Sequence, residues 1–393
     1  MSEQPRVVFV NRYFHPDHSA TSQMVSDLAF HLASRGWKVG AITSRQRYDD
    51  ASAQLASREM VSLPPPLFEH PLPARRGEGS ANVQITRVWS TRFGRGWLPG
   101  RAVDYLTFYW SAFLAMRRER EAIIVALTDP PLLSFVATLA SNRVVNWSQD
   151  VFPEVATALG VKGPGVLKRV RDWSLRRART NVVLSDGMAR RLNAPRMEVQ
   201  HNWADAALRP HPRTDDRFTI AYSGNLGRAH EFETIVGAIR ALPEVQFVFT
   251  GGGAQLAVVR EATRELGNVS FRPYAPREQL GESLSAADAH FVTLQPALDG
   301  LIVPSKFYGI LAVARPVLCI GAGELAAMVR EHGIGIAVDP GDVTALVEGI
   351  RSLAADRAKA NEMGSRGRAL YEERFAPPVA LANWERILTE ASR

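Results

Sequence analysis

The first residues of the chain show the hydrophobic pattern of a strand, a helix and a second strand. Residues 7–10 form a short run of β-branched and aromatic residues, which predicts a buried strand. Apolar residues then recur at helical spacing through 21–35, and Gly36 follows where a helix C-cap belongs. Residues 37–43 predict the next strand. Because such units build parallel sheets covered by helices, this opening predicts an α/β fold.

The same pattern continues and then restarts in the second half of the chain. Residues 62–82 predict an exposed loop, because they are rich in proline, glycine and charge. Residues 204–217 contain prolines and charges without apolar periodicity, and they predict a linker. Helices are predicted at 231–242 and 305–313. Further strands are predicted at 123–128, 143–147, 181–184, 218–222, 245–250, 290–294, 316–320 and 334–338.

These elements predict two α/β domains. The first spans residues 1–210 and the second spans 214–377, and a C-terminal helix at 378–393 could pack back on the first domain. Each domain opens on a strand. Ligands of open α/β sheets bind at the carboxyl ends of the strands, so two such sheets facing each other would form one cleft.

The composition is that of an ordinary globular protein, with 46% hydrophobic and 22% charged residues. The single cysteine, Cys319, cannot form an intramolecular disulfide, and no Cys/His cluster has the spacing of zinc ligands. The first residues lack the basic and apolar regions of a signal peptide, and no apolar run approaches the roughly 18–20 residues that span a bilayer. We therefore expect a protein of the reducing cytoplasm.

Positive charge is concentrated in the first half. Residues 1–213 hold 29 Lys and Arg against 18 Asp and Glu, a net charge of +11. Residues 214–393 hold 18 against 22, a net charge of −4. A basic domain favours an anionic partner, and nucleic acid, a membrane surface and phosphorylated substrates all fit this description.

Two stretches, 92–120 and 168–179, supply much of this charge. In both, arginines flank apolar residues that include tryptophan, a composition typical of a peripheral membrane face. The alternative is a pair of amphipathic helices whose apolar side is core and whose arginines are solvated. Neither stretch has a recognisable nucleic-acid motif or a pattern of stacking aromatics, which argues against a nucleic-acid partner.

Three segments of the second half have features of an anion site. Residues 223–228 (Ser-Gly-Asn-Leu-Gly-Arg) join a strand to a helix, where backbone N–H groups can approach an anion and Arg228 can bind phosphate. The glycines at 251–253 suit close approach of a ligand or of another loop. Ser305 is a natural N-cap, and Lys306 in the first turn opposes the helix dipole, which a bound anion would explain. A plain turn, a flexible connector and a solvated lysine are the alternatives.

Two segments of the first half have candidate groups for a substrate hydroxyl. Residues 147–154 (Trp-Ser-Gln-Asp-Val-Phe-Pro-Glu) follow a strand, so Asp150 could orient a hydroxyl or accept its proton, or simply cap a helix. The loop at 13–19 (Tyr-Phe-His-Pro-Asp-His-Ser) is similarly placed. His15 and His18 in this loop could contact substrate or be solvated.

The order of these segments resembles nucleotide-sugar glycosyltransferases of the GT-B fold, specifically glycosyltransferase family 4, over nearly the whole chain. The resemblance is strongest over residues 222–238, 250–253, 286–288, 304–317, 341–342 and 366–375. Residues 303–312, 147–154 and 202–205 are similar to a subgroup that builds bacterial surface polysaccharides. The resemblance implies two Rossmann-like domains whose parallel sheets face each other across a cleft.

The resemblance also implies an activity. A retaining hexosyl- or N-acetylhexosaminyltransferase would move a sugar from a nucleoside-diphosphate sugar to a lipid-linked saccharide, at the inner face of the cytoplasmic membrane. Such enzymes usually need no metal or other cofactor, so protein cations and helix N-termini stabilise the departing diphosphate.

Carried over to this chain, the resemblance implies a set of site residues. The catalytic residues are Asp150, Arg228 and Lys306. The donor-binding residues are Gly224, Asn225, Gly227, His230, Gly251, Gly252, Pro304 and Ser305. The acceptor-binding residues are His15, Ser19 and Gln149, and no metal ligand is expected.

The chain departs from the family pattern at several positions. The usual phosphate-binding Arg and Lys fall at Asn225 and His230, so Arg228 in the same loop would take over the phosphate contact. The usual paired glutamates fall at Leu301 and Gly309. A sugar-nucleotide epimerase on a similar fold, a catalytically inert relative and a nucleic-acid-binding module remain as alternatives.

Overall fold

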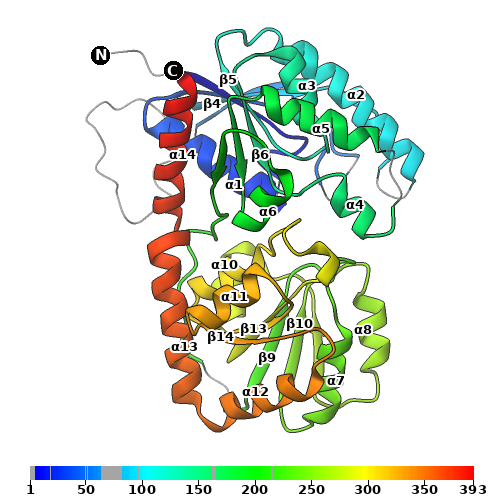
Figure 1. Ribbon diagram of the computed structural model, residues 1–393, viewed down its shortest axis with the longest axis vertical. Helices are drawn as coiled ribbons and strands as arrows, with labels where there is room; N and C mark the ends of the chain where they lie inside the picture. The colour runs from blue at the N-terminus through cyan, green and yellow to red at the C-terminus, as the bar shows by residue number, and fades with distance from the viewer. Residues whose placement is uncertain are drawn as a thin grey trace. The chain divides into compact units, whose positions relative to one another are not determined.

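The computed structural model describes residues 5–17, 19–48, 50, 52–62, 82–94, 97–161, 165–213 and 216–393. The chain divides into two compact units. Unit 1 comprises residues 1–201 and 380–393, and unit 2 comprises residues 202–379. Each unit holds one mainly parallel sheet covered by helices, which confirms the predicted α/β class (Figure 1). The loop expected at 62–82 lies, except for its two ends, outside the described residues.

Within the described residues, the sheet of unit 1 has eight strands in the order β3-β4-β2-β1-β5-β6-β7-β8. Only the edge pair β3–β4 is antiparallel among them. The strands are β1 (Arg6–Val10), β2 (Lys38–Ser44), β3 (Arg58–Ser62), β4 (Asn82–Val88), β5 (Ile123–Ala126), β6 (Val144–Ser148), β7 (Thr180–Val183) and β8 (Met197–Val199). The helices are α1 (Ala20–Ser34), α2 (Leu98–Met116), α3 (Leu133–Ala140), α4 (Glu154–Ala158), α5 (Val166–Arg177), α6 (Asp186–Leu192) and the end of α14 (Pro377–Ser392).

In the described part of unit 2 the sheet has six parallel strands in the order β11-β10-β9-β12-β13-β14. The strands are β9 (Thr219–Ser223), β10 (Gln246–Thr250), β11 (Val269–Arg272), β12 (Ala289–Thr293), β13 (Val317–Ile320) and β14 (Gly335–Val338). The helices are α7 (Glu233–Ala241), α8 (Leu256–Ala262), α9 (Leu280–Ser285), α10 (Lys306–Ala312), α11 (Glu324–Glu331), α12 (Val343–Ala355) and α13 (Arg357–Leu370), with short turns η1 (Arg277–Gln279), η2 (Pro296–Leu298) and η3 (Tyr371–Phe375).

The central strands form where the sequence has uninterrupted apolar runs. Residues 7–10 of β1 and 123–126 of β5 are buried, because helices cover both faces of a parallel sheet. All of the strands predicted from such runs are present. Gly36 ends the first helical segment one residue after the C-cap, Arg35, and its φ of 87° is the left-handed conformation that glycine adopts at this position. No helix among the described residues is long and apolar enough to cross a bilayer.

The boundary between the units lies earlier than the predicted linker. Residues 202–210, expected in the first domain, lie in unit 2. Ala204 and Leu208 are buried in the apolar core of that unit, so the start of the segment predicted as a linker is packed instead. Residues 380–393 return to unit 1, where the buried ring of Trp384 lies 4.5 Å from the ring of Trp147 and Asn383 donates to Gln200 Oε1.

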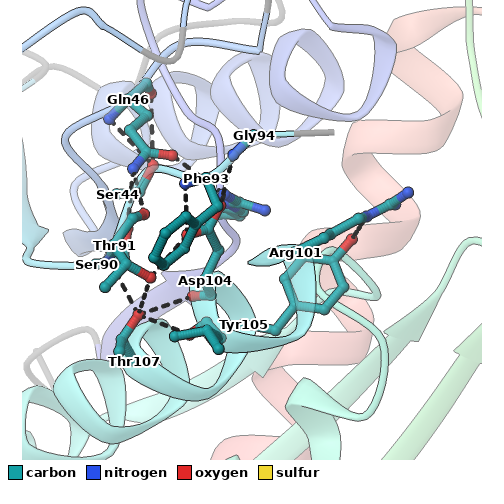
Figure 2. Close-up of polar contacts among 12 residues, drawn as sticks. Ser44, Gln46, Ser90, Thr91, Phe93, Gly94, Arg101, Asp104, Tyr105 and Thr107 are labelled. Atoms are coloured by element: carbon teal, nitrogen blue, oxygen red, sulfur yellow. Dashed lines mark hydrogen bonds and ion pairs between the residues drawn. The ribbon is translucent and has the colours of Figure 1, made fainter. Parts of the chain in front are cut away.

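A buried polar network joins α2 to the carboxyl ends of β1, β2 and β4 (Figure 2). Asp104 of α2 is fully buried, and its carboxylate accepts hydrogen bonds from Thr91 Oγ1 at 2.7 Å and from the backbone N–H groups of Phe93 and Gly94 at 3.0 Å. The buried guanidinium of Arg12 lies 3.5 Å from the same carboxylate. A buried charge is tolerated only when it is paired and hydrogen-bonded, and these donors meet that requirement.

Gln46, which follows β2, joins this network to the segments that follow β1 and β4. Its side-chain oxygen accepts from Arg12 Nη2 at 3.1 Å, and its amide donates to Thr91 O at 2.7 Å and to Ser90 Oγ at 3.3 Å. Four segments distant in the sequence are therefore bound together through side chains. This fixes how the segment 91–94 meets the first turn of α2.

Replacing Asp104 tests this network. In Asp104→Asn, the buried Arg12 guanidinium loses its carboxylate and the amide cannot accept from every donor, so we expect the free energy of unfolding to fall by about 2–4 kcal/mol. Urea denaturation followed by circular dichroism measures it. Glu121→Gln, at an exposed carboxylate after α2, is the matched control. An Asp104→Asn loss no larger than that of the control would contradict the role given to the network.

Candidate active site

The order of strands in unit 2 reverses between β9 and β12. β9 pairs with β10 on one side and with β12 on the other. Connections from these two strands leave in opposite directions, so a crevice opens beyond their carboxyl ends, which is where open α/β sheets bind ligands. Residues 223–228 follow β9 at this edge, and residues 294–306 run from β12 to the start of α10. The predicted donor-binding segments therefore meet at one edge of the sheet.

Two loops at this edge interlock through their backbones. Gly224 N donates to Thr250 O at 2.8 Å, and Leu226 N donates to Gly252 O at 2.7 Å. A Cβ on Gly251 would lie 2.1 Å from Gly224 O, and one on Gly253 would lie 2.3 Å from Asn225 Oδ1. The glycine run was expected to allow close approach of a ligand or another loop, or to be a flexible connector. Gly251 and Gly253 allow the close approach of another loop. Gly252 instead faces the exposed ring of Tyr274.

Lys306 is the first residue of α10, and its ammonium lies beside these loops. Nζ is buried without a hydrogen-bond partner among the described residues, and it lies 3.5 Å from the centroid of the Tyr222 ring. A Cβ on Gly224 would be 3.9 Å from Nζ, so no side chain separates the ammonium from the loop after β9. Burial lowers the pKa of Lys306 well below its usual range. An anion at this position would restore the charge and satisfy the donor.

The ring of His230 lies edge-on to the ring of Tyr222, with 5.9 Å between the ring centroids. Its Nδ1 is 2.6 Å from the carbonyl oxygen of Thr293, which can only accept, so Nδ1 carries the proton and Nε2 is left as an acceptor. Burial, followed by the positive charge of Lys306, lowers the pKa of His230 to about 4. At neutral pH this imidazole is therefore uncharged, and it does not replace the cation that the family pattern has at this position.

Arg228 is exposed at the same edge. The backbone of its loop is held by Gln295, whose side chain donates to Arg228 O at 2.8 Å and whose N–H donates to Ala229 O at 2.9 Å. The guanidinium makes no hydrogen bond or ion pair with the described residues and is open to solvent. Because the backbone is held and the cationic side chain is exposed, the guanidinium can turn to contact an anionic ligand at this edge.

The segment before α10 differs in one detail from the prediction. Ser305 occupies the N-cap position, but its exposed side chain makes no capping hydrogen bond, and Pro304 beside it is buried. Leu301 is buried, and a Cβ on Gly309 would meet the side chains of Leu284 and Leu208. The two positions that carry glutamate in the family pattern are therefore a buried leucine and a glycine beside leucine side chains.

In unit 1 the strand order reverses between β1 and β5, and Asp150 lies beyond β6 near that edge. Desolvation, followed by the charge of Asp129, raises the pKa of Asp150 to about 6. Asp150 is exposed, so its carboxylate is open to a ligand. Gln149 is nearly buried, and its backbone N–H donates to Thr128 Oγ1 at 3.3 Å.

Arg171 of α5 fixes the chain that follows Asp150. Its guanidinium is buried, donates to Phe152 O at 2.9 Å and forms a two-point ion pair with Glu154 at 2.9 Å. Sequence reasoning counted this arginine only as part of a basic stretch. The signal that would have found it is the acidic residue two positions after Phe152.

The other predicted acceptor residues are less open. The ring of His15 lies edge-on to Phe30 with 5.6 Å between the ring centroids, and its backbone N–H donates to Ser26 Oγ. Ser19 occupies the N-cap position of α1 without a side-chain cap, and its N–H donates to Asp17. His18 lies outside the described residues.

Sequence reasoning also missed Tyr222, Tyr274 and Thr293. Tyr222 and Thr293 end buried strands, where an aromatic or hydroxyl side chain looks like part of the core. Among the residues that the structure describes, no group of three or more His, Cys, Asp or Glu could hold a metal ion.

Comparisons with known proteins agree with this arrangement. Residues 205–370 match the family described as glycosyl transferases group 1. The chain is 27% identical to a probable glycosyltransferase, WbjE of Pseudomonas aeruginosa, over 72% of this chain and 78% of that protein. It is 22% identical to WcaI of Escherichia coli K12, a putative colanic acid biosynthesis glycosyl transferase, over 86% and 89%.

The fold is also that of solved structures, among them WaaG, a glycosyltransferase involved in lipopolysaccharide biosynthesis, with a TM-score of 0.65 at 13% identity over 97% of this chain and 98% of that chain. Anabaena Alr3699/HepE in complex with UDP-glucose superposes with a TM-score of 0.70 at 13% identity, over 98% of this chain and all of that chain. The predicted GT-B fold is thus confirmed. The chain is a glycosyltransferase with this fold, and its second unit is a glycosyl transferases group 1 domain.

The protonation of His230 tests the geometry of unit 2. We expect its imidazole to titrate near pH 4 in NMR spectra, and its pKa to rise in Lys306→Met, because the lysine charge is lost. Below its ordinary value of 6.5 the unfolded chain takes up a proton that the folded chain refuses, so this group reduces stability as the pH falls from 6.5 toward 4. His290, whose pKa is lowered to about 4 by burial away from Lys306, is the internal control. Equal shifts of both histidines in Lys306→Met would contradict the assignment.

Proposed function

We propose that this enzyme moves a hexose or N-acetylhexosamine from a nucleoside-diphosphate sugar to a lipid-linked saccharide during synthesis of a bacterial surface polysaccharide. The observation that carries the donor is the unpaired ammonium of Lys306 at the carboxyl edge of unit 2. HepE, a structure with the same fold, is described in complex with UDP-glucose, and WcaI is described as an enzyme of colanic acid synthesis. Both descriptions support the donor class and the polymer class.

The chemical problem is the negative charge that develops on the departing diphosphate. In this proposal the bond between the sugar C1 and the diphosphate oxygen breaks, and a bond to the acceptor oxygen forms with the configuration at C1 kept. The acceptor proton ends on the departing phosphate. Lys306, Arg228 and the N–H groups near Gly224 stabilise the diphosphate, and no metal ion is assigned to this role.

Asp150 and Gln149 are assigned to the acceptor in unit 1. The carboxylate of Asp150 accepts a hydrogen bond from a sugar hydroxyl, and Arg171 acts only as a positioning residue for the chain after it. His230 remains neutral and supplies Nε2 as an acceptor. Membrane association and the lipid-linked acceptor belong to this proposal.

Donor binding is tested with a panel of nucleoside diphosphates. At one hundred times its Kd, the correct nucleotide should stabilise the protein by about 2.7 kcal/mol, seen as a rise in Tm. Lys306→Met and Arg228→Ala should each lose most of this rise, whereas Lys359→Met, at an exposed lysine of α13, should keep it. A wild-type protein that no nucleoside diphosphate stabilises, or a Lys306→Met variant that binds normally, would refute the donor site.

Product analysis tests the reaction. We expect transfer with an unchanged anomeric configuration in the NMR coupling constants, a rate insensitive to EDTA, and a fall in kcat of about a hundredfold in Asp150→Asn. Because ionised Asp150 is the active form, the wild-type rate should fall below about pH 6. Glu121→Gln is the control. Conversion of the donor to an epimer without acceptor would favour the epimerase alternative, and inversion at C1 would exclude a retaining mechanism.

A further inference from the structure

Helix α2 is apolar on two opposite faces. At 100° per residue, Asp104, Phe108, Ala112 and Met116 lie on one side of the helix, and all four are buried. Four other apolar side chains fall within an arc of about 80° on the opposite side. They are Val103, Leu106, Trp110 and Leu114, with 40%, 64%, 65% and 43% of their surface exposed.

The exposed apolar side chains of this second face are unusual for a helix side that is in contact with water. A helix packed on a domain normally turns charged or polar side chains toward water, and a helix that is apolar all round normally has contacts all round. The core of unit 1 covers only the face that includes Phe108, Ala112 and Met116. The alternative raised for residues 92–120, an apolar side in the core and solvated arginines, describes one side of α2, and the exposed apolar face is additional to it.

Two more exposed aromatic side chains lie at the start of the helix. The rings of Phe93 and Trp97 are 5.7 Å apart, edge to face, and each is more than half exposed. The missing side chain of Gly100 gives them room, since a Cβ there would lie 2.3 Å from Trp97 Cε3. The buried carboxylate of Asp104 holds the backbone of Phe93 and Gly94, so the exposed ring of Phe93 is presented by a fixed backbone (Figure 2). We call Phe93, Trp97, Val103, Leu106, Trp110 and Leu114 the α2 surface.

The charge around the α2 surface is mainly positive. Residues 89–121 contain six arginines and three acidic residues, of which Asp104 is buried in the network described above and Glu119 is paired with Arg6. Arg117 falls on the same arc as Trp110 and is exposed, as are Arg92 and Arg118. Exposed tryptophans within a rim of arginines form a pattern suited to the interface of an anionic membrane.

We propose that the α2 surface docks unit 1 on an anionic lipid bilayer, with Trp110 and Leu106 inserted at the headgroup level and the arginines against lipid phosphates. This deepens the function proposed above and rests on its lipid-linked acceptor. A second copy of the chain is the less suitable occupant, because a symmetric pairing of the α2 surface would bring arginines of one sign together. Helix α5 makes no comparable surface, since Val166 is its one largely exposed apolar side chain, Leu175 is buried and Arg171 is paired internally.

Binding to vesicles tests the surface. The full-length protein should float with vesicles of phosphatidylcholine and phosphatidylglycerol, bind pure phosphatidylcholine vesicles weakly, and dissociate as salt rises. Leu106→Gln/Trp110→Gln should lower the partition coefficient at least about tenfold, with an unchanged or higher Tm because water-exposed apolar area is removed. Val258→Gln is the matched control, because Val258 of α8 in unit 2 is also 64% exposed.

A charge variant separates the two contributions. Arg117→Gln/Arg118→Gln should weaken binding by about tenfold at low salt and change little at high salt. Arg264→Gln/Lys359→Gln, which removes two exposed cations of unit 2, should bind as the wild type. Tryptophan fluorescence should shift to the blue on binding, and the shift should be smaller in Trp110→Gln, in which Trp97 remains on the α2 surface.

The outcomes distinguish this inference from the proposed function. No binding to anionic vesicles, or equal binding by Leu106→Gln/Trp110→Gln, would overturn the α2 surface while nucleoside-diphosphate stabilisation kept the transferase proposal intact. A dimer that dissociates in Leu106→Gln/Trp110→Gln without vesicle binding would assign the surface to a second copy. Vesicle binding without any nucleotide stabilisation would uphold the surface and refute the donor site.

Discussion

The candidate site in unit 2 depends on one buried lysine ammonium. The ammonium of Lys306 is buried over the ring of Tyr222 without a hydrogen-bond partner among the described residues. A buried donor in this state costs free energy until an anion satisfies it. The surrounding loops are fixed around that position, since Gly251 and Gly253 allow two backbones to interlock and the carbonyl of Thr293 holds the proton of the neutral His230 on Nδ1. A diphosphate bound at this site would pair with the ammonium and accept its hydrogen bonds.

At the carboxyl edge of its sheet, unit 1 also has a buried ionisable group, but this group is fully hydrogen-bonded. Asp104 is as deeply buried, but four donors surround its carboxylate, so it needs no external ligand. A fully satisfied polar network is rigid, and this one fixes both the first turn of α2 and the segment that carries Phe93. Rigidity here allows apolar side chains to remain on the outer face of α2 without collapsing onto the core. The hydrogen-bonded network of Asp104 thus stabilises the scaffold of this enzyme. The buried ammonium of Lys306, which lacks a hydrogen-bond partner among the described residues, marks the proposed donor site.

Much of the fold could be predicted because the central strands are covered on both faces and must be apolar throughout. Residues 7–10 and 123–126 are examples. The edge strand β3 was missed, since its residues are mostly exposed and its sequence, Arg-Glu-Met-Val-Ser, has no long apolar run. The linker was placed too late, because Ala204 and Leu208 are buried by contacts with distant residues rather than by a local repeat. The predicted cap at Ser305 occupies its position without making the bond.

The sequence by itself determined the fold class, the family resemblance and the loops that carry the candidate site, because periodicity and turn residues act over a few neighbours. It could not decide which of Arg228, His230 and Lys306 is charged, free or paired. That depends on burial and on atoms far away in the chain, such as the Thr293 carbonyl and the Tyr222 ring. Nor could it show that the apolar residues of α2 divide between the core and an exposed face, since only packing against the sheet determines which side of a helix is covered.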